Sequence, residues 1–253
     1  MGRFDGKAAI VTGAAQGIGA AIARRLASEG AAVAVVDLTA ERARGTTEAI
    51  EADGGKAVAI GADVSKTEDA QTAVAAALEG LGRLDILVNN AGITRDNLLF
   101  KMTDEDWDAV LAVNLRSAFV MARECQKHFV AQKYGKIVSL SSRSALGNRG
   151  QVNYAASKAG IMGLTATLSL ELGPFGINVN AVAPGFVATE MTDATARRIG
   201  MEPDAFRAAA AEQIPVRRVG RPEDIAAAVA FLAADESSFI SGQTVQINGG
   251  DNR

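Results

Sequence analysis

The stretch from Ala8 to Gly19 reads AAIVTGAAQGIG. Its first four residues form a short apolar run, which predicts a buried strand that ends at Thr12 and Gly13. A helical pattern follows from Ile18 to Glu29, and Gly30 stops it. A strand, a glycine-rich turn and a helix in this order predict the first unit of an α/β fold.

The same alternation continues through the rest of the chain. Further apolar runs predict strands at residues 32–36, 56–60, 86–88, 136–140, 177–182 and 244–247. Helical patterns separate them at residues 39–52, 67–78, 104–132 (with possible breaks), 154–172 and 222–232. Strands that are apolar on both faces and alternate with helices form parallel sheets covered on both sides. We therefore expect a single domain over residues 1–253, a Rossmann-like, doubly wound parallel sheet of about seven strands with helices on both faces.

Residues 186–214 lack a strand pattern. They carry scattered apolar side chains among alanines, and three arginines, Arg197, Arg198 and Arg207. A mobile apolar segment with basic points suits an acyl chain on an anionic carrier, so we expect a substrate lid within the domain. An ordinary pair of surface helices remains the alternative.

Composition excludes several classes of function. The net charge of −3 over 253 residues gives no basic footprint for nucleic acid. No apolar run approaches the roughly 20 residues of a membrane span, and residues 1–7 show no signal peptide pattern. Cys125 is the only cysteine, which fits a reducing cytoplasm, and His128 is the only histidine, so no metal site is predicted.

The glycine-rich turn is a candidate phosphate site. Ligands of doubly wound sheets bind beyond the carboxyl ends of the strands. Glycines permit positive φ and close approach of a phosphate, and the helix N-terminus offers free N–H groups. The spacing is G-x-x-x-G-x-G, and a purely structural turn is the alternative. The residues expected to hold a dinucleotide here are Gly13, Gln16, Gly17, Ile18 and Gly19.

Asp37 ends the second predicted strand, 24 residues after Gly13. A carboxylate at this distance accepts hydrogen bonds from the adenosine ribose and repels a 2′-phosphate. Leu38 adds no positive charge, so NAD(H) is preferred and NADP(H) stays possible because of Arg42. The alternative role for Asp37 is a cap on the helix that begins near Thr39.

Two further loops follow the third and fourth strands. Asp63 and Val64 follow the third, where Asp63 has the chemistry to accept a bond from an adenine amino group. Asn89, Asn90, Ala91 and Gly92 follow the fourth, where small residues let a cofactor lie close. Turn or cap roles are the alternatives for each.

Tyr154 and Lys158 are four positions apart, which places both on one face of a helix. A free tyrosine titrates near ~10, and a nearby ammonium lowers that pKa, so the pair forms an adjustable acid and base. Ser141 and Ser142 end the preceding strand and bring a hydroxyl close to Tyr154. Asn114 is a polar residue among apolar neighbours in the 104–132 pattern. It serves either a core hydrogen bond at a helix irregularity or a water relay to Lys158.

Taken in order, these motifs resemble the classical short-chain dehydrogenase/reductase family, from near Lys7 to about Gly250. The resemblance implies an oxidoreductase with a catalytic set of Asn114, Ser142, Tyr154 and Lys158, in which Lys158 also binds the nicotinamide ribose. It further implies nicotinamide contacts from the stretch after the sixth strand, namely Pro184, Gly185, Val187 and Thr189. The family's usual spacing of 13 residues selects Ser141, whereas aligning the strand from Gly135 selects Ser142. We prefer Ser142, because loops absorb deletions and strands do not.

Within the family, residues 147–154, residues 178–186 and Gly249-Gly250 are similar to 3-oxoacyl-(acyl-carrier-protein) reductases. The expected reaction is therefore reduction of a 3-oxoacyl thioester to the 3-hydroxyacyl thioester, although Asp37 argues against the NADPH that those enzymes use. An NAD-dependent secondary-alcohol dehydrogenase of catabolism is the alternative within the family. A regulatory NAD-binding protein is the alternative outside it, and the full catalytic set argues against that.

Expected partners are a small-molecule substrate or an acyl thioester, with acyl carrier protein as a candidate carrier of the thioester. Lys133, Lys136, Arg143 and Arg149 are candidates for guiding an acidic carrier. Small residues at 155, 156, 159, 160 and 163 permit close helix packing, and the family is often tetrameric, so we expect a homotetramer. A face buried within one subunit would show the same pattern.

Overall fold

The computed structural model describes residues 2–251, and one parallel sheet of seven strands runs through them. The strands are β1 (Ala8–Thr12), β2 (Ala32–Asp37), β3 (Lys56–Gly61), β4 (Ile86–Asn89), β5 (Gly135–Leu140), β6 (Ile177–Pro184) and β7 (Thr244–Ile247). Their order in space is β3-β2-β1-β4-β5-β6-β7. From β1 the chain adds β2 and β3 on one side, and it then crosses back to add β4 to β7 on the other side of β1. This change of side opens a crevice at the carboxyl ends of β1 and β4.

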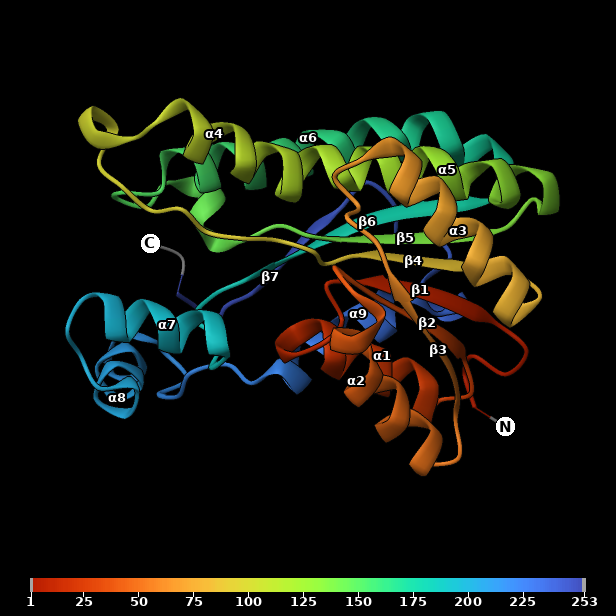
Figure 1. Ribbon diagram of the computed structural model, residues 1–253, viewed down its shortest axis with the longest axis horizontal. Helices are drawn as coiled ribbons and strands as arrows, with labels where there is room; N and C mark the ends of the chain where they lie inside the picture. The colour runs from red at the N-terminus through yellow and green to blue at the C-terminus, as the bar shows by residue number, and fades with distance from the viewer. Residues whose placement is uncertain (1, 252–253) are drawn as a thin grey trace.

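Helices cover both faces of the sheet (Figure 1). On one face lie α1 (Gly17–Ser28), α2 (Ala40–Ala52) and α9 (Pro222–Ala233). On the other lie α3 (Thr67–Leu81), α4 (Asp104–Leu111), α5 (Ser117–Gln132) and α6 (Val152–Leu172). Alternate residues of β1 show how the two cores are separated: Ala9 and Val11 pack with α1 and α9, whereas Ala8 and Ile10 pack with α3 and α5. This is the doubly wound sheet that the sequence predicts.

The expected helix over residues 104–132 is interrupted. A π-helical turn, Ala112–Arg116, lies between α4 and α5. A π turn widens the helix by one residue and leaves backbone groups that need other partners. Asn114 is the buried residue of this turn, so the break falls at the polar residue that the sequence singles out.

Residues 186–214 form a short helical hairpin at one end of the sheet. It consists of α7 (Glu190–Arg198) and α8 (Pro203–Gln213), and Figure 1 shows both beyond the carboxyl ends of the strands. Short 3-10 turns complete the described chain at Leu99–Lys101, Arg143–Leu146, Gly173–Phe175 and Asp235–Ser237. Among residues 2–251 no helix has the length and apolar character to cross a bilayer.

Candidate active site

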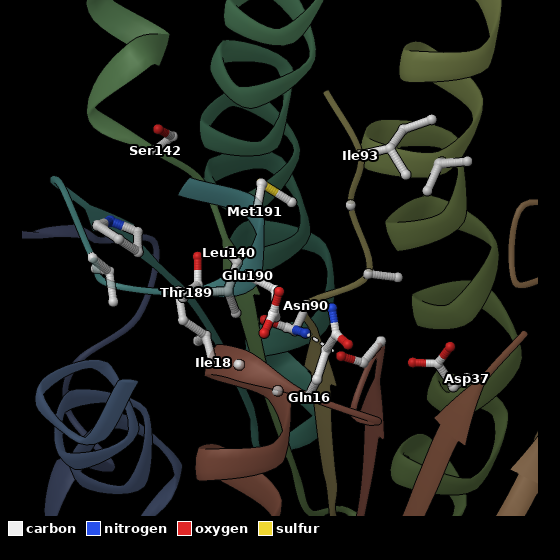
Figure 2. Close-up of a pocket in the computed structure, with 18 of the residues that line it drawn as sticks. Gln16, Ile18, Asp37, Asn90, Ile93, Leu140, Ser142, Thr189, Glu190 and Met191 are labelled. Carbon is white, nitrogen blue, oxygen red and sulfur yellow. Dashed lines mark hydrogen bonds between the residues drawn. The ribbon is translucent and has the colours of Figure 1, made fainter. Parts of the chain in front are cut away.

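A cleft opens where the carboxyl ends of β1 and β4 diverge. Its volume of about 350 Å³ lies in the range of small-ligand pockets, roughly 300–1,000 Å³. Loops after six strands, β1 to β6, contribute to its wall, and α7 closes one side. Figure 2 shows Asp37 at one end of the cleft and Ser142 at the other, with Gln16 and Asn90 between them. The following residues expected from the sequence line it: Gly13, Gln16, Gly17, Ile18, Gly19, Asp37, Asp63, Val64, Asn90, Ala91, Gly92, Ser142, Tyr154, Lys158, Pro184, Gly185, Val187 and Thr189.

The three glycines of the first loop differ in what a side chain at each position would contact. A Cβ on Gly19 would lie 2.3 Å from the Gly13 carbonyl oxygen, and a Cβ on Gly13 would lie 2.8 Å from Ala91 Cα. Both glycines therefore permit close packing of backbone on backbone. Gly17 instead has a φ of +57°, and its Cβ would meet nothing closer than Thr189 at 3.7 Å. Its missing side chain leaves space on the side that faces the cleft.

The N-terminus of α1 also faces the cleft and is not capped by a side chain. Gln16 is the N-cap residue and makes no capping hydrogen bond, and the first turn contains no acidic residue. The first N–H groups of a helix have no partner within it, and the helix dipole attracts anions. The loop thus has the donors, the field and the space that the pyrophosphate of a dinucleotide needs.

Asn90 and Thr12 join the loops after β1 and β4. The Asn90 amide donates to the carbonyl oxygens of Thr12 and Gly13, each at 2.9 Å. The Thr12 hydroxyl accepts from the N–H groups of Asn90 and Ala91, each at 3.1 Å. The Asn90 side chain therefore holds the glycine loop in place, which is the loop-supporting alternative to a direct cofactor contact.

Asp37 lies at the far end of the cleft and is only 8% exposed. Its Oδ2 accepts from the Ala15 N–H at 3.1 Å, and its Oδ1 accepts from the Leu38 N–H at 3.0 Å. The cap of α2 is Thr39, whose side chain accepts from the Arg42 N–H. Asp37 is therefore not the helix cap, and its carboxylate is fixed at the cleft wall. Arg42 Nε lies 2.8 Å from Asp37 Oδ1, so the one cation near this carboxylate in the described loop is paired with it.

Asp63 lines the cleft, but its carboxylate is used within its own loop. Oδ1 accepts from both the N–H and the hydroxyl of Ser65, at 3.1 and 2.6 Å, and Lys66 lies 3.5 Å from Oδ2. These partners hold the pKa of Asp63 below its usual value despite partial burial. The turn role left open by the sequence is thus present. Val64 beside it is buried and contributes an apolar wall.

Tyr154 and Lys158 come from the first two turns of α6 and face the other end of the cleft. Lys158 Nζ lies 5.6 Å from the centre of the Tyr154 ring and donates to the Leu140 carbonyl at 2.6 Å. Burial lowers the pKa of Lys158 from 10.5 to about 8. Burial also raises the pKa of Tyr154, and a hydrogen bond with Ser142 only partly opposes this rise. Desolvation therefore raises the Tyr154 pKa, whereas the sequence predicts that Lys158 lowers it.

The two serines after β5 point to different places. Ser141 is buried, and its hydroxyl donates to the Lys158 carbonyl of α6 at 2.8 Å. The Ser142 hydroxyl accepts from the Ser144 N–H at 3.1 Å, and it lies close enough to Tyr154 to lower the pKa of that phenol. The geometry therefore brings together Ser142 and Tyr154, whereas Ser141 fastens the strand to the helix.

Asn114 uses the π turn to reach the loop after β4. Its Oδ1 accepts from the Ile93 N–H at 2.8 Å, and its Nδ2 donates to the Ile93 carbonyl at 3.0 Å. Nδ2 also lies 3.3 Å from the Ser157 hydroxyl, which donates to the Tyr154 carbonyl. Gly92 lies between Asn114 and Lys158, because a Cβ there would be 3.4 Å from Asn114 Oδ1 and 3.7 Å from Lys158 Nζ. The core hydrogen bond is thus present, and the water relay to Lys158 stays a prediction.

The stretch after β6 carries the chain from the sheet to α7. Pro184 ends β6, and a Cβ on Gly185 would lie 2.8 Å from Asn248 Cβ. Val187 is buried, and Thr189 caps α7 with Thr192 in a reciprocal pair of hydrogen bonds. Thr189, Glu190 and Met191 face the cleft (Figure 2), and the last two extend the wall beyond the residues expected from the sequence.

Ion pairs hold the helical hairpin of residues 186–214. Arg207 of α8 donates to both carboxylate oxygens of Asp193 at 2.6 Å, and Arg198 of α7 contacts Asp96 in the loop after β4 at 2.5 Å. Two of the three arginines expected to serve as basic points for a carrier are therefore paired with carboxylates.

The four cations proposed for guiding a carrier do not form one surface. Lys136 is buried at the start of β5, where it donates to Asn178 Oδ1 at 2.7 Å, and Lys133 ends α5 just before it. Arg143 follows the other end of the same strand. The expected role in guiding a carrier is wrong for Lys136, because the sheet buries it, and it stays a prediction for Lys133, Arg143 and Arg149.

Two supporting residues lie within stretches quoted from the sequence, but the sequence alone gave neither of them a role. Thr12 is an unremarkable strand-end residue, yet its hydroxyl joins two loops. Asn153 is fully buried, and its amide donates to the Arg95 and Asp106 carbonyls at 3.0 and 3.2 Å, which fixes the start of α6. The only available signal was a polar side chain directly next to Gly13 or Tyr154.

Comparison with known proteins decides the family. A family model described as "Enoyl-(Acyl carrier protein) reductase", which belongs to the short-chain dehydrogenases/reductases, matches residues 13–252. The chain belongs to the short-chain dehydrogenase/reductase family. It is 50% identical to the short-chain reductase protein NovJ of Streptomyces niveus, covering 96% of this chain and 92% of the relative. It is 44% identical to the 3-oxoacyl-[acyl-carrier-protein] reductase FabG of Staphylococcus aureus strain Mu50, covering 96% and 97%.

Solved structures agree with the family. One, assigned as a short-chain alcohol dehydrogenase from Sinorhizobium meliloti 1021, superposes with a TM-score of 0.91 at 38% identity and covers 98% of this chain and 96% of its own. This short-chain dehydrogenase/reductase is thus an oxidoreductase that interconverts carbonyl and alcohol groups with a nicotinamide cofactor. The alternative of a non-catalytic regulatory protein is set aside by this membership. Among residues 2–251 no group of three or more His, Cys, Asp or Glu side chains is placed to hold a metal ion.

Proposed function

We propose that this enzyme reduces a 3-oxoacyl thioester to the 3-hydroxyacyl thioester and prefers NADH. The observation that carries the chemistry is the convergence of the Ser142 and Tyr154 hydroxyls at one end of a cleft whose other end is a dinucleotide cradle. Two neighbouring hydroxyls that line the same end of a cleft are suited to hold one carbonyl oxygen between them. When bound, the nicotinamide cofactor supplies the hydride.

The protein's own side chains supply the proton. Tyr154 keeps its proton at neutral pH, because burial raises its pKa, so it is a donor to the developing alkoxide. Lys158 has a pKa of about 8 and therefore exchanges a proton near neutral pH. As the proton leaves Tyr154, the protonated form of Lys158 stabilises the phenolate. Asn114 holds Gly92 and Ile93 against this pair and completes the catalytic set of Asn114, Ser142, Tyr154 and Lys158.

The preference for NADH rests on Asp37. A carboxylate that is 92% buried and fixed by two backbone N–H groups cannot easily turn away from a 2′-phosphate. Arg42 is half-exposed and bound to Asp37, so it lowers the repulsion without reversing it. Replacing Asp37 by alanine releases Arg42 for a phosphate. We expect Asp37→Ala to raise the ratio of NADPH to NADH activity by at least about tenfold, since one charge contact of this kind is worth roughly 1.5–3 kcal/mol. An unchanged ratio in steady-state rates would discredit the role of Asp37.

The acyl substrate is supported by the likeness to FabG over almost the whole chain. Residues 186–214 supply a lid, in which Met191 faces the cleft and the Phe186 and Phe206 rings pack edge to face at 5.1 Å. A second candidate is an NAD-dependent secondary-alcohol dehydrogenase. The pairing of Arg198 and Arg207 with carboxylates favours it, because the lid then offers little free positive charge to an acidic carrier.

Initial rates with acetoacetyl-coenzyme A, measured side by side with NADH and NADPH, test the proposal. Strong turnover with NADH supports both the thioester substrate and the role of Asp37. Turnover with NADPH alone keeps the substrate and overturns the cofactor preference. Turnover only of secondary alcohols with NAD, and none of the thioester, replaces the first candidate with the second.

The enzyme is further proposed to be a homotetramer. Large apolar side chains are exposed along α4, α5 and the end of α6, among them Phe119 at 44% and Leu170 at 80%. Several exposed residues of α6 before Leu170 are small, including Ala156, Ala159 and Gly163. Gly160 instead packs inward on Leu115. Exposed apolar patches of this kind mark protein interfaces. Sedimentation that shows only a monomer at micromolar concentration would reject this assembly.

A further inference from the structure

The last described residue of the chain reaches the loop that carries Ser142. The Asp251 carboxylate makes an ion pair with the guanidinium of Arg143, the residue that directly follows Ser142. The Asp251 side chain is 8% exposed, whereas that of Arg143 is 33% exposed. A carboxylate this buried has lost most of its water, so its attraction for the guanidinium is screened little.

The chain end is itself held in a fixed path. The Asp251 N–H donates to the Asn248 carbonyl at 3.2 Å, and the Asn248 amide donates back to the Asp251 carbonyl at 2.8 Å. Gly249 and Gly250 between them both have positive φ, at +63° and +88°. This closed turn points the Asp251 side chain at Arg143 rather than leaving it on a loose tail.

The same turn packs against the segment that follows α8. Val216 donates to the Gly249 carbonyl at 3.2 Å, and a Cβ on Gly249 would lie 2.7 Å from Ile214 and 2.6 Å from Val216. Ile214 is the last residue of the proposed lid, and Val216 follows directly after it. The turn thus contacts the lid on one side and the Ser142 loop on the other.

The turn that carries Ser142 packs on α6, and the loop beyond it is joined to Asn97 through Gly150 and Gln151. Ser142 caps a 3-10 turn of four residues, and the next residues, including exposed Leu146 and Gly147, return over the surface to α6. The ion pair is the contact between this turn and the C-terminal end of the chain. An error of about 1 Å in a reacting group can cost on the order of 100-fold in rate, so orientation of this turn matters for the hydroxyl it carries.

We infer that Asp251 is a positioning residue, which acts through Arg143 to orient Ser142 and to couple that orientation to the end of the lid. The inference rests on the proposed role of Ser142. Neither residue is placed to touch substrate, so their effect is on the rate of the chemical step and not on cofactor affinity.

The test uses the full-length enzyme, steady-state reduction of acetoacetyl-coenzyme A with NADH, and the variants Asp251→Asn, Asp251→Glu, Arg143→Gln and the double variant. Asp251→Asn is the informative change, because it removes the charge and leaves Arg143 where water can reach it. We expect kcat to fall about tenfold with the KM for NADH unchanged, and Asp251→Glu to restore part of the loss. The double variant should be no slower than the worse single variant, since both remove one interaction.

Glu29→Gln is the matched control. Glu29 is a partly buried carboxylate paired with Arg3 and Arg25. It lies between the end of α1 and the start of β2, at the amino ends of the strands, whereas the cleft lies at their carboxyl ends. It should lower stability without changing kcat, which separates positioning from a general loss of an ion pair. Thermal midpoints of all variants identify any that fail to fold, and Asp251→Glu then carries the comparison.

Ser142→Ala distinguishes the two ways in which the idea could fail. If Ser142→Ala is inactive while Asp251→Asn keeps full kcat, the positioning role is wrong and the proposed function stands. The positioning role is equally wrong if the losses of the two single variants add in the double variant. If Ser142→Ala keeps full activity, the role of Ser142 fails and the inference fails with it.

Discussion

The two ends of the cleft are built by different means. At the Asp37 end, the wall is mainly backbone: three glycines, an uncapped helix N-terminus and a carboxylate fixed by two N–H groups. At the Ser142 end, side chains do the work, because Lys158 and Asn114 are buried polar groups that each depend on one or two specific partners. The first end is shaped by the absence of side chains and the second by their presence.

This difference teaches where each end is vulnerable. A backbone cradle fails when an atom is added, because the close contacts of Gly13 and Gly19 leave no room. A side-chain network fails when an atom or a charge is removed, because a buried partner is then left unsatisfied. Each of the following changes affects one end and should leave the other intact.

The largest effect is expected from Tyr154→Phe. The change removes one oxygen at the Ser142 end, so kcat for acetoacetyl-coenzyme A should fall by about 10³-fold, the scale of general acid catalysis. NADH binding, followed by fluorescence titration, should be unchanged because the Asp37 end is untouched.

Tyr134→Phe is the control for this substitution, since the chain has only two tyrosines. The Tyr134 hydroxyl donates to Asp235 at 2.7 Å, before the start of β5 and away from the cleft. Full activity in Tyr154→Phe, or an equal loss in Tyr134→Phe, would contradict the assignment of the proton donor.

The next effect concerns stability and pH. The pKa of Lys158 is about 8 in the folded enzyme and 10.5 as its ordinary value. Between these values the unfolded chain binds more protons, so folding stability rises as pH rises through this window. Below pH 8 both states are protonated and the full penalty of burying the charge remains. The shift of about 2.5 pKa units corresponds to about 3 kcal/mol.

Lys158→Met removes this pH dependence and retains the length of the side chain. Relative to that variant, the wild-type enzyme without cofactor should therefore gain up to about 3 kcal/mol between pH 8 and pH 10.5, as measured by denaturant unfolding. Lys56→Met, at the exposed start of β3, is the control. A constant difference between wild type and Lys158→Met across this window would show that burial does not perturb the lysine.

The smallest effect is expected from Gly19→Ala at the backbone end. Its Cβ would lie 2.3 Å from the Gly13 carbonyl oxygen and 2.5 Å from Asn90 Nδ2. Overpacking of this kind costs about 2 kcal/mol. If the free loop shifts to relieve it and NADH binding must restore the cradle, the Kd for NADH should rise by up to roughly thirtyfold. Gly45→Ala in α2, where a Cβ meets nothing within 4 Å, is the control. If both alanine variants bind NADH as tightly as the wild type, the loop is not a close-fitting cradle.

The same contrast explains what could be predicted from the sequence. The seven strands, their parallel order and the glycine loop follow from apolar runs and from glycine spacing, which are properties of the chain read locally. The π turn at Asn114 was foreseen only as a possible break, because its cause is the hydrogen-bonding of one buried amide to Ile93, a residue 21 positions earlier.

Other features depend on contacts that no local pattern encodes. The pairing of Arg207 with Asp193 and of Arg198 with Asp96 turned expected free cations of the lid into ion pairs. Lys136 looked like a surface charge, but the sheet buries it against Asn178. The pKa of Tyr154 moved opposite to expectation, because the sequence shows that Lys158 is near but not how little water reaches either group.

The two serines after β5 occupy consecutive positions of the chain. Successive residues of an extended chain point to opposite sides, so Ser141 is turned to α6 and Ser142 to the cleft. Chemically they are identical, and only an odd or even count along the strand distinguishes them. Inserting one residue within β5 would move Ser141 into the place of Ser142 and Leu140 into the place of Ser141. The identity of the hydroxyl in the cleft is thus set by counting, and an engineer could move it by one without designing a new side chain.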